Sequence, residues 1–247
     1  MRLFDSHCHL CDMKSFSITD ELAAITSGYS HESNLKNSEI VKSDKTGRIH
    51  CIMGIAPQTA QREENLESEL AKWAEFIRTS PVRPLAIGEI GLDNHWGKTK
   101  EDKIRQQYCF EKMIELAREL HFPIVIHSRD AETEILDFLA AHHWSGRGDE
   151  RFIMHCFSGT LEEAQRAVDL GGIISIPPIR SKDRKKIARD IPLGKLIVET
   201  DAPYIGKTLN DINLSVQIIA DAKGMQPPLV ADATYKNAAS FFGVRGD

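Results

Sequence analysis

Two histidines near the start of the chain have a spacing that suits metal binding. His7 and His9 follow a short apolar run that begins at Arg2. In a β-strand, alternate side chains point to the same side, so histidines two residues apart can bind one metal ion together. On a helix, the same arrangement would need a spacing of three or four residues. The motif therefore predicts half of a metal site, with the remaining ligands supplied by distant parts of the chain.

Further metal-ligating residue types stand at the ends of other apolar, strand-like segments. Glu89, His127, His155 and Asp201 each end or follow such a segment. The carboxyl ends of parallel strands meet on one face, where barrel enzymes carry their chemistry, so we expect these side chains to join the first two histidines. A carboxylate buried in an apolar strand is costly without a partner, which favours a cationic partner for Glu89.

These ligand types fit a hydrolytic site with two divalent metal ions. One ion is expected to bind His7, His9 and Asp201. The other is expected to bind His127 and His155, and the Glu89 carboxylate is expected to bridge the two ions. Two ions about 3.5–4 Å apart can polarise a phosphoryl or acyl oxygen and activate a water molecule as hydroxide. Asp201 is the expected proton acceptor, and Glu89 is the second expected catalytic residue. The mixed ligands favour Zn or Mn over Ca, and Mg is a weaker candidate.

The elements that must position these residues alternate along the chain. Seven apolar segments predict strands: 2–7, 49–55, 85–90, 123–127, 151–155, 172–176 and 196–200. An eighth strand, at 27–30, is only weakly marked. Segments with a helical period lie among and after them: 64–79, 101–120, 132–142, 161–170, 181–190, 211–223 and 229–242. The alternation predicts a parallel sheet. A strand count near eight favours a closed (β/α)8 TIM barrel, as one domain over 1–247, rather than an open doubly wound sheet.

The composition limits the partners and the location of the protein. The 247 residues are 41% hydrophobic and 27% charged, which is typical of a globular protein. No apolar run approaches the roughly 18 residues of a membrane span, and the N-terminus has no secretory signal, so we expect no membrane partner. Five irregularly spaced cysteines favour a reducing, cytoplasmic location. With a net charge of −5, any binding of nucleic acid must rely on local cations.

Five motifs at the strand ends resemble a known family. In chain order they read FDSHCHL at 4–10, GEIGLD at 88–93, IHSRDA at 126–131, HCFSG at 155–159 and ETDAPY at 199–204. Together they resemble the TatD family of metal-dependent hydrolases, within the amidohydrolase superfamily. The resemblance implies a (β/α)8 barrel and a divalent-metal site at the six residues named above. It also implies a phosphodiesterase activity usually described as deoxyribonuclease, with nucleic acid as substrate. No obligate protein partner is evident.

The chain departs from this family in its loops. After the third expected strand the family usually has Gly-x-His-Pro-His, whereas here Ala56 and Gln58 stand in the histidine positions. The loop after Asp201 lacks the family's Asn-Glu-Pro element, and the region between 10 and 50 is short. All six expected metal ligands are kept. The departures therefore concern the loops that would contact a substrate.

Two residues are expected to contact the substrate. Arg129 follows the expected ligand His127 in a position suited to a phosphate or carboxylate, although a salt bridge with Asp130 is an alternative. Asp93 lies just after the fourth strand on the same face. The basic run 180–186 follows the seventh strand and could bind a nucleic-acid backbone, but an exposed charged helix is the simpler interpretation.

Other residues near the motifs have ordinary structural interpretations. Cys8 and Cys11 form a Cys-x-x-Cys motif, but no second pair accompanies them, so we expect Cys8 to pack in the core. Cys156 is expected to pack as well. Asp5 shares the strand face of the first histidine and is expected to support a ligand from behind. A similar role is possible for Glu199.

Three functions are compatible with these residues. The leading one is a metal-dependent phosphodiesterase of the deoxyribonuclease type. The second keeps the same metal site but cleaves a carboxyl ester or amide, as in a D-aminoacyl-tRNA deacylase. The third is a non-catalytic barrel that binds metal for stability. A phosphotriesterase-type site is disfavoured, because Glu89 stands where such enzymes carry a carboxylated lysine.

Overall fold

Eight parallel strands form the centre of the computed structural model, which describes residues 1–244. They are β1 (Leu3–Cys8), β2 (Leu22–Ser27), β3 (Ile49–Ile52), β4 (Ile87–Asp93), β5 (Ile124–Arg129), β6 (Phe152–Met154), β7 (Ile173–Ile176) and β8 (Leu196–Val198). Strands β1 to β3 are hydrogen-bonded in chain order, as are β4 to β8. Residues 245–247, the last three of the expected domain, lie outside the described part of the chain.

Backbone hydrogen bonds at two seams join these two groups of strands. At the first seam, the Gly88 amide of β4 donates to the Met53 carbonyl just after β3, at 2.9 Å. At the second, the Asp201 amide donates to the His7 carbonyl of β1, also at 2.9 Å. The expected TIM-barrel fold is therefore confirmed. The second seam also ties together the backbones of two expected metal ligands.

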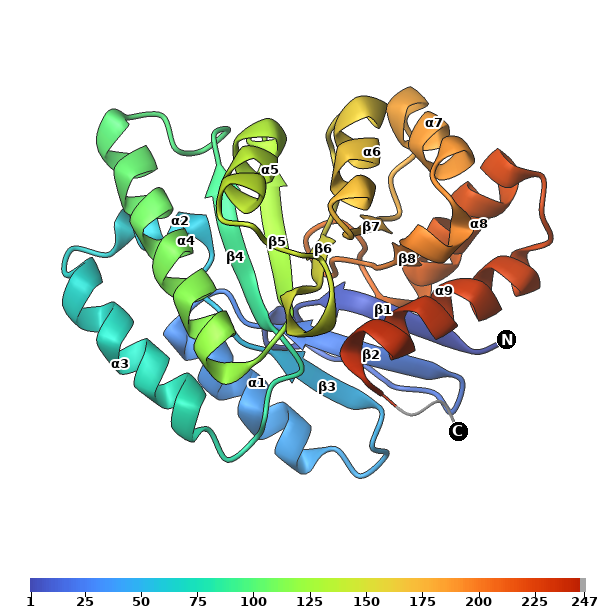
Figure 1. The fold of residues 1–247 in the computed structure, drawn as a ribbon. Coiled ribbons are helices and arrows are strands. Elements are labelled where there is room, and N and C mark those ends of the chain that lie inside the picture. Colours follow the sequence, from blue (N-terminus) through green and yellow to red (C-terminus); the bar gives the residue numbers. More distant parts are fainter. Residues whose placement is uncertain (245–247) are drawn as a thin grey trace.

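Helices surround the strands on the outside (Figure 1). They are α1 (His31–Ser43), α2 (Pro57–Arg62), α3 (Leu66–Thr79), α4 (Lys100–Leu120), α5 (Glu132–Ala141), α6 (Leu161–Asp169), α7 (Lys182–Asp190), α8 (Ile212–Lys223) and α9 (Pro227–Phe242). All seven expected helices are present, with small shifts at their ends. Among residues 1–244, none of the helices has the length and apolar character needed to cross a membrane.

The segment between β1 and β3 differs from the expectation. The strand expected at 27–30 is wrong, because β2 ends at Ser27 and Ser30 is already the N-cap of α1. The Ser30 side chain accepts a hydrogen bond from the Ser33 amide, which satisfies a free donor of the first helical turn. Helices α1 and α2 were not expected at all.

Helix α1 lacks an apolar face, which explains why its sequence gave no helical signal. Its buried residues are small and polar: Ser33, Asn34, Asn37 and Ser38. The Asn34 amide group exchanges hydrogen bonds with the backbone of Gly54, at 3.0 and 3.2 Å. The Asn37 side chain donates to the Ser27 carbonyl at 2.9 Å. Buried amides, which satisfy backbone groups after β2 and β3, therefore dock this helix on the barrel.

An apolar cluster fills the end of the barrel away from the strand termini that carry the motifs. Phe4 is 1% exposed and stacks on Phe242 of α9, with 6.0 Å between ring centroids. The Tyr235 ring approaches Phe4 edge-on at 5.6 Å. Helix α9 therefore packs against the side chains of β1 and closes this end of the barrel.

We expect Phe4→Ala to lower the free energy of unfolding by about 3–5 kcal/mol, because a large buried ring would leave a cavity that the barrel cannot fill. Urea denaturation followed by circular dichroism measures the change. Phe16→Ala is the matched control, since Phe16 is 38% exposed and should cost far less. Equal losses in the two variants would contradict a packing role for Phe4.

Candidate metal centre

All six expected metal ligands meet at the carboxyl end of the barrel. Their ligand atoms form three overlapping groups, each within 4.8 Å: His7, His9 and Glu89; Glu89, His127 and His155; His7, His155 and Asp201. Five of the six side chains are buried, and the His127 side chain is 16% exposed. Five strand ends that are far apart in the sequence therefore supply one compact cluster.

The Glu89 carboxylate lies at the centre of this cluster. Its Oε2 atom is 3.5 Å from His7 Nε2 and 3.8 Å from His9 Nε2. Its Oε1 atom is 2.9 Å from His127 Nδ1 and 3.5 Å from His155 Nε2. Each carboxylate oxygen thus faces one pair of histidines, which is the arrangement expected of a bridging carboxylate.

The separations between these atoms fit donors that surround a cation. Ligand atoms at about 2.1 Å from an ion, at tetrahedral angles, lie about 3.4 Å from each other. The Nε2 atoms of His7 and His9 are 3.3 Å apart, and Asp201 Oδ1 is 3.1 Å from His9 Nε2. Nitrogen and oxygen donors at these distances suit a divalent ion of the Zn or Mn type.

The local course of β1 brings His7 into the cluster. The register of β1 against β2 shifts after Asp5. As a result, consecutive side chains both reach across the barrel: Ser6 Oγ is 3.3 Å from Ser175 Oγ, and the His7 ring stacks on the His155 ring at 3.9 Å. Such irregularities are common near active sites because they redirect a side chain.

A similar irregularity in β4 carries Glu89. The register of β4 against β5 shifts between Ile87 and Ile90. The neighbouring backbones are very close here, since a Cβ atom added to Gly54 would lie 2.6 Å from the carbonyl carbon of Gly88. Only glycine fits at position 54, which allows the chain just after β3 to pack directly against the backbone of the bridging carboxylate.

Hydrogen bonds outside the cluster orient several of its members. His9 Nδ1 is 3.2 Å from the Ser27 carbonyl, so it donates there and leaves the Nε2 lone pair for a metal. The Glu199 carboxylate accepts a hydrogen bond from the Cys156 amide at 2.6 Å, and its Oε1 atom is 3.7 Å from His155 Nδ1. Glu199 therefore lies behind His155, in a position that supports it.

Asp5 acts on the backbone of the cluster rather than on a histidine ring. It accepts hydrogen bonds from the backbone amides of His7 at 3.3 Å and Thr200 at 2.9 Å. Burial raises the pKa of Asp5 to about 8. Its second oxygen accepts a hydrogen bond from the Thr200 hydroxyl, so Asp5 holds the backbones of His7 and Thr200 in place.

The charges of the cluster compensate one another. Burial opposes the charged form of Glu89, but His155, His127 and His7 hold its pKa well below the usual range. Burial would lower the pKa of His155, but Glu89 and Glu199 raise it well above the ordinary value. The pKa of His127 is also raised, despite its burial, by Asp93 and Glu89. The raised pKa values of His155 and His127 thus favour protons that compensate the buried carboxylates, whereas burial lowers the pKa of His7.

Asp93, for which a substrate contact was expected, is not among the residues that line the cleft. It is fully buried, and its Oδ2 atom is 2.9 Å from His127 Nε2. The same oxygen accepts a hydrogen bond from the Gln58 amide at 2.7 Å, while Oδ1 accepts from the Trp96 backbone at 2.8 Å. Asp93 is therefore occupied on both oxygens and lies behind His127.

A cleft of about 620 Å³ opens above the cluster. Besides site residues, its walls carry three arginines and three aromatic rings: Arg62, Arg129, Arg184, Tyr29, Trp96 and Tyr204. Trp96 and Tyr204 are each 56% exposed. The Arg129 guanidinium lies 5.9 Å from the centroid of the Trp96 ring. Arg129 thus lies in the wall of the cleft, next to an exposed aromatic ring.

Where the chain leaves β6, one expectation changes, and where it leaves β7, another mostly holds. Cys156 lines the cleft and does not pack in the core, because β6 ends at Met154 and the backbone of Cys156 turns with a φ of 45°. In the basic run 180–186, Arg184 lines the cleft. Arg180 instead pairs with Asp221 on the surface, at 3.0 Å. The run is mostly a charged surface with one residue turned to the cleft.

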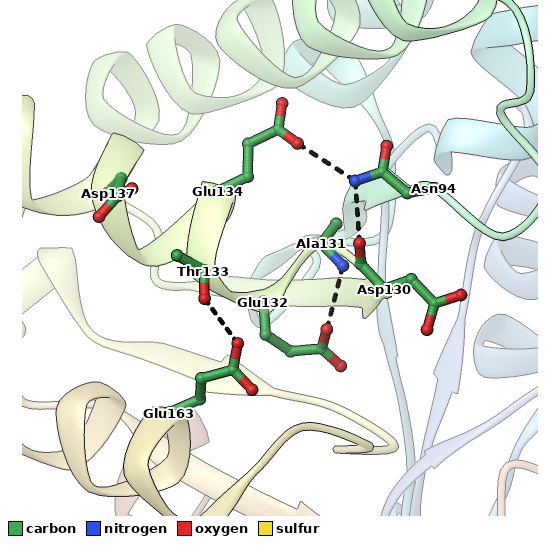
Figure 2. A pocket seen from close by; sticks show the side chains of 8 residues that line it. All are labelled: Asn94, Asp130, Ala131, Glu132, Thr133, Glu134, Asp137 and Glu163. Carbon is green, nitrogen blue, oxygen red and sulfur yellow. Dashed lines mark hydrogen bonds between the residues drawn. The ribbon is translucent and has the colours of Figure 1, made fainter.

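A second hollow, of about 530 Å³, lies beside the first turn of α5 (Figure 2). Its walls are acidic, but donors of the chain already engage most of the carboxylates drawn there. Asn94 donates to Glu134 at 3.2 Å, and Thr133 donates to Glu163 at 2.6 Å. Ser158 donates to Glu132 at 2.9 Å. This hollow therefore offers no counterpart to the histidine-rich cluster.

Several cleft residues were not singled out from the sequence. Tyr204 ends the last motif, so its position on the catalytic face was a usable signal. Its hydroxyl and that of Tyr29 both donate to Asp12, at 3.0 and 3.2 Å. Tyr29 and Arg62 gave no signal, because the helices that they adjoin were not expected.

Comparisons with known proteins agree with this geometry. The family model of the TatD-related DNases matches residues 4–243. An uncharacterized metal-dependent hydrolase of Methanocaldococcus jannaschii, MJ1582, is 30% identical and covers 98% of this chain and 97% of its own length. The human deoxyribonuclease TATDN3 is 32% identical, with 78% of this chain and 72% of its own length aligned.

Solved structures share the fold. The TatD homologue YjjV of Escherichia coli superposes with a TM-score of 0.84 at 23% identity, over 99% of each chain. A TatD-family hydrolase of Entamoeba histolytica gives a TM-score of 0.83 at 18% identity, over 99% of each chain. With the family model matching nearly the whole length and the strand-end motifs in the same cluster, this chain belongs to the TatD-related DNase family.

Proposed function

We propose that this protein is a two-metal phosphodiesterase that cleaves nucleic acid. The observation that carries the proposal is the Glu89 carboxylate, which lies between two pairs of histidines at the base of a cleft lined by arginines. Membership of the TatD-related DNase family supports it, as does a relative that bears the name of deoxyribonuclease.

The six clustered residues would hold the two ions. The first ion would be held by His7, His9 and Asp201. The second would be held by His127 and His155, and the Glu89 carboxylate would be shared by both. When bound, two divalent ions stabilise negative charge on a phosphoryl oxygen and lower the pKa of water. Zn, Mn and Mg are the candidates, and the imidazole donors favour the first two.

Asp201 is the proposed proton acceptor. It is 8% exposed and lines the cleft, so a water molecule that enters can reach its carboxylate. Burial would raise the pKa of Asp201, but His9 and the other histidines hold it below the usual range. The group is therefore ionised near pH 7 and able to accept a proton at its carboxylate oxygen.

The walls of the cleft would bind the nucleic-acid chain. Arg129, Arg62 and Arg184 offer charged donors to phosphate oxygens. The exposed faces of Trp96 and Tyr204 offer surfaces on which bases can stack. Local cations of this kind would attract a polyanion although the chain has a net charge of −5.

We expect Asp201→Asn to keep the fold and to lower kcat on an oligonucleotide by about 10²-fold or more at saturating Mn, because the amide cannot accept the proton. Metal content measured on the same sample separates lost ions from lost proton transfer. Asp20→Asn is the control, since the Asp20 side chain is 96% exposed and pairs with Arg48. Undiminished turnover of Asp201→Asn would refute its role.

The same assays distinguish the alternative substrates. An oligonucleotide, a D-aminoacyl-tRNA and a simple carboxyl ester are compared with one metal-loaded preparation. The proposal requires hydrolysis of the phosphodiester to be fastest. Faster release of the amino acid from tRNA would replace it with the deacylase function, and bound metal without any hydrolysis would favour a non-catalytic barrel.

We expect Arg129→Ala to raise KM for an oligonucleotide by about tenfold with little change in kcat, because a charged hydrogen bond to phosphate is lost. The salt dependence of KM should also weaken, since fewer counterions are released on binding. Arg166→Ala is the control, because Arg166 pairs with Asp137 on the surface. An unchanged KM would mean that Arg129 serves only the structure.

Metal affinity should rise with pH through the neutral range. The pKa values of His127 and His155 are raised in the metal-free protein, so both rings carry protons below those pKa values and must lose them to bind an ion. Calorimetric titration with Zn in buffers of different ionisation enthalpy should reveal proton release that fades at higher pH. Binding with no proton release near pH 7 would contradict the raised pKa values.

A further inference from the structure

Gln58, on the first turn of α2, joins the cleft to the residues behind the cluster. It lines the cleft, and its Nε2 atom donates a hydrogen bond to Asp93 Oδ2 at 2.7 Å. The same nitrogen is 3.3 Å from His127 Nε2. An amide oxygen in this place would face a carboxylate, so the nitrogen must be the atom that points to Asp93.

These contacts fix which ring nitrogen of His127 faces Asp93 and which faces the cluster. Asp93 Oδ2 and the Gln58 amide nitrogen both face His127 Nε2. His127 Nε2 lies 2.9 Å from Asp93 Oδ2, so it carries a proton and donates it to that carboxylate. Nδ1 lies 2.9 Å from Glu89 Oε1 and is therefore the nitrogen whose lone pair a bound metal would take.

His127 is unusual among the four histidines in this respect. His7, His9 and His155 turn Nε2 toward the Glu89 carboxylate. His127 turns Nδ1 toward it instead, at 2.9 Å. Nδ1 lies next to the Cβ atom of the ring, so this mode of binding demands a well-defined ring orientation and a fixed partner for the opposite nitrogen.

Asp93 is held from behind by groups other than Gln58. The Gln106 side chain accepts a hydrogen bond from the Asp93 amide at 2.8 Å and donates to its carbonyl at 3.2 Å. The Trp96 amide donates to Oδ1 at 2.8 Å. The backbone of Asp93 is therefore fixed, and Gln58 is the side chain that binds its Oδ2 from the cleft.

We propose that Gln58 is a positioning residue for the second metal, acting through Asp93 to hold His127 in the orientation that binds through Nδ1. The inference rests on the proposed metal site. A neutral amide donor holds the carboxylate without adding charge or competing as a strong ligand. Gln58 thus connects the wall of the cleft, where it lies, to the orientation of a ligand of the second metal.

Metal binding tests this role directly. Gln58→Met removes the donor and keeps the length of the side chain. In a Zn titration followed by the ¹⁵N signals of the histidine rings, we expect affinity at His127 to fall about tenfold, while affinity reported by His9 is kept. Gln107→Met on α4 is the matched control, because Gln107 is also half-buried and pairs with Glu111.

A double-mutant cycle tests the route through Asp93. Asp93→Asn alone should weaken Zn binding at His127, since an amide can face Nε2 as a donor and favour the other ring tautomer. Gln58→Met should then add little further loss in the Asp93→Asn protein. In the Zn-loaded protein, the ¹⁵N shifts should show a proton on His127 Nε2 and the metal on Nδ1 in the natural protein, and a weaker preference for this arrangement in Asp93→Asn.

The opposite results would overturn the inference. Unchanged Zn affinity at both positions in Gln58→Met, with a raised KM for oligonucleotide, would make Gln58 a substrate contact instead. Fully additive losses in the cycle would show that it does not act through Asp93. Both readouts are independent of the reaction: a protein without phosphodiesterase activity that still shows the tautomer and the affinity change would refute the proposed function alone.

Discussion

The structure depends on one buried carboxylate. Glu89 lies inside the barrel with each oxygen against a pair of histidines. An isolated carboxylate in this environment would be too costly to keep ionised, so the fold must supply positive charge from either protons or metal ions. The raised pKa values of His127 and His155 are the proton form of this compensation. The same electrostatic demand that admits metals therefore also shapes the metal-free site.

Bringing these ligands together at the strand ends requires unusual local backbone conformations. Asp201 adopts a φ of 47°, a left-handed conformation that is sparsely populated by residues with a Cβ atom. Its carbonyl accepts hydrogen bonds from the amides of Tyr204 and Ile205, each at 2.9 Å, and its own amide donates to His7. The turn that presents the carboxylate is thus also the seam that closes the barrel. Fold and site are here held by the same hydrogen bonds.

The sequence predicted what depends on the repeating pattern and on convergence at strand ends. Seven strands, seven helices and the grouping of all six ligand-type residues follow from periodicity and from the geometry of parallel barrels. It failed where polar groups replace apolar ones, as in α1, which buries Asn34 and Asn37. It also could not place side chains at strand ends: Asp93 is the last paired residue of β4 and Cys156 lies beyond β6, and parity cannot tell whether such a side chain faces the cleft or a ligand from behind.

Positive and negative side chains lie in separate areas of the catalytic face, which the net charge of the protein does not reveal. Arginines line the cleft, whereas the neighbouring hollow carries several carboxylates, including Asp130 directly after Arg129 (Figure 2). At an ionic strength of about 0.15 M, fields fade within about 8 Å, so a polyanion near the face responds to the closest groups and not to the total of −5. For the nucleic-acid substrate proposed above, the acidic hollow would repel phosphates that the arginines of the cleft attract. This segregation of charge would direct such a chain across the cleft and away from the adjoining surface, although the protein is acidic overall.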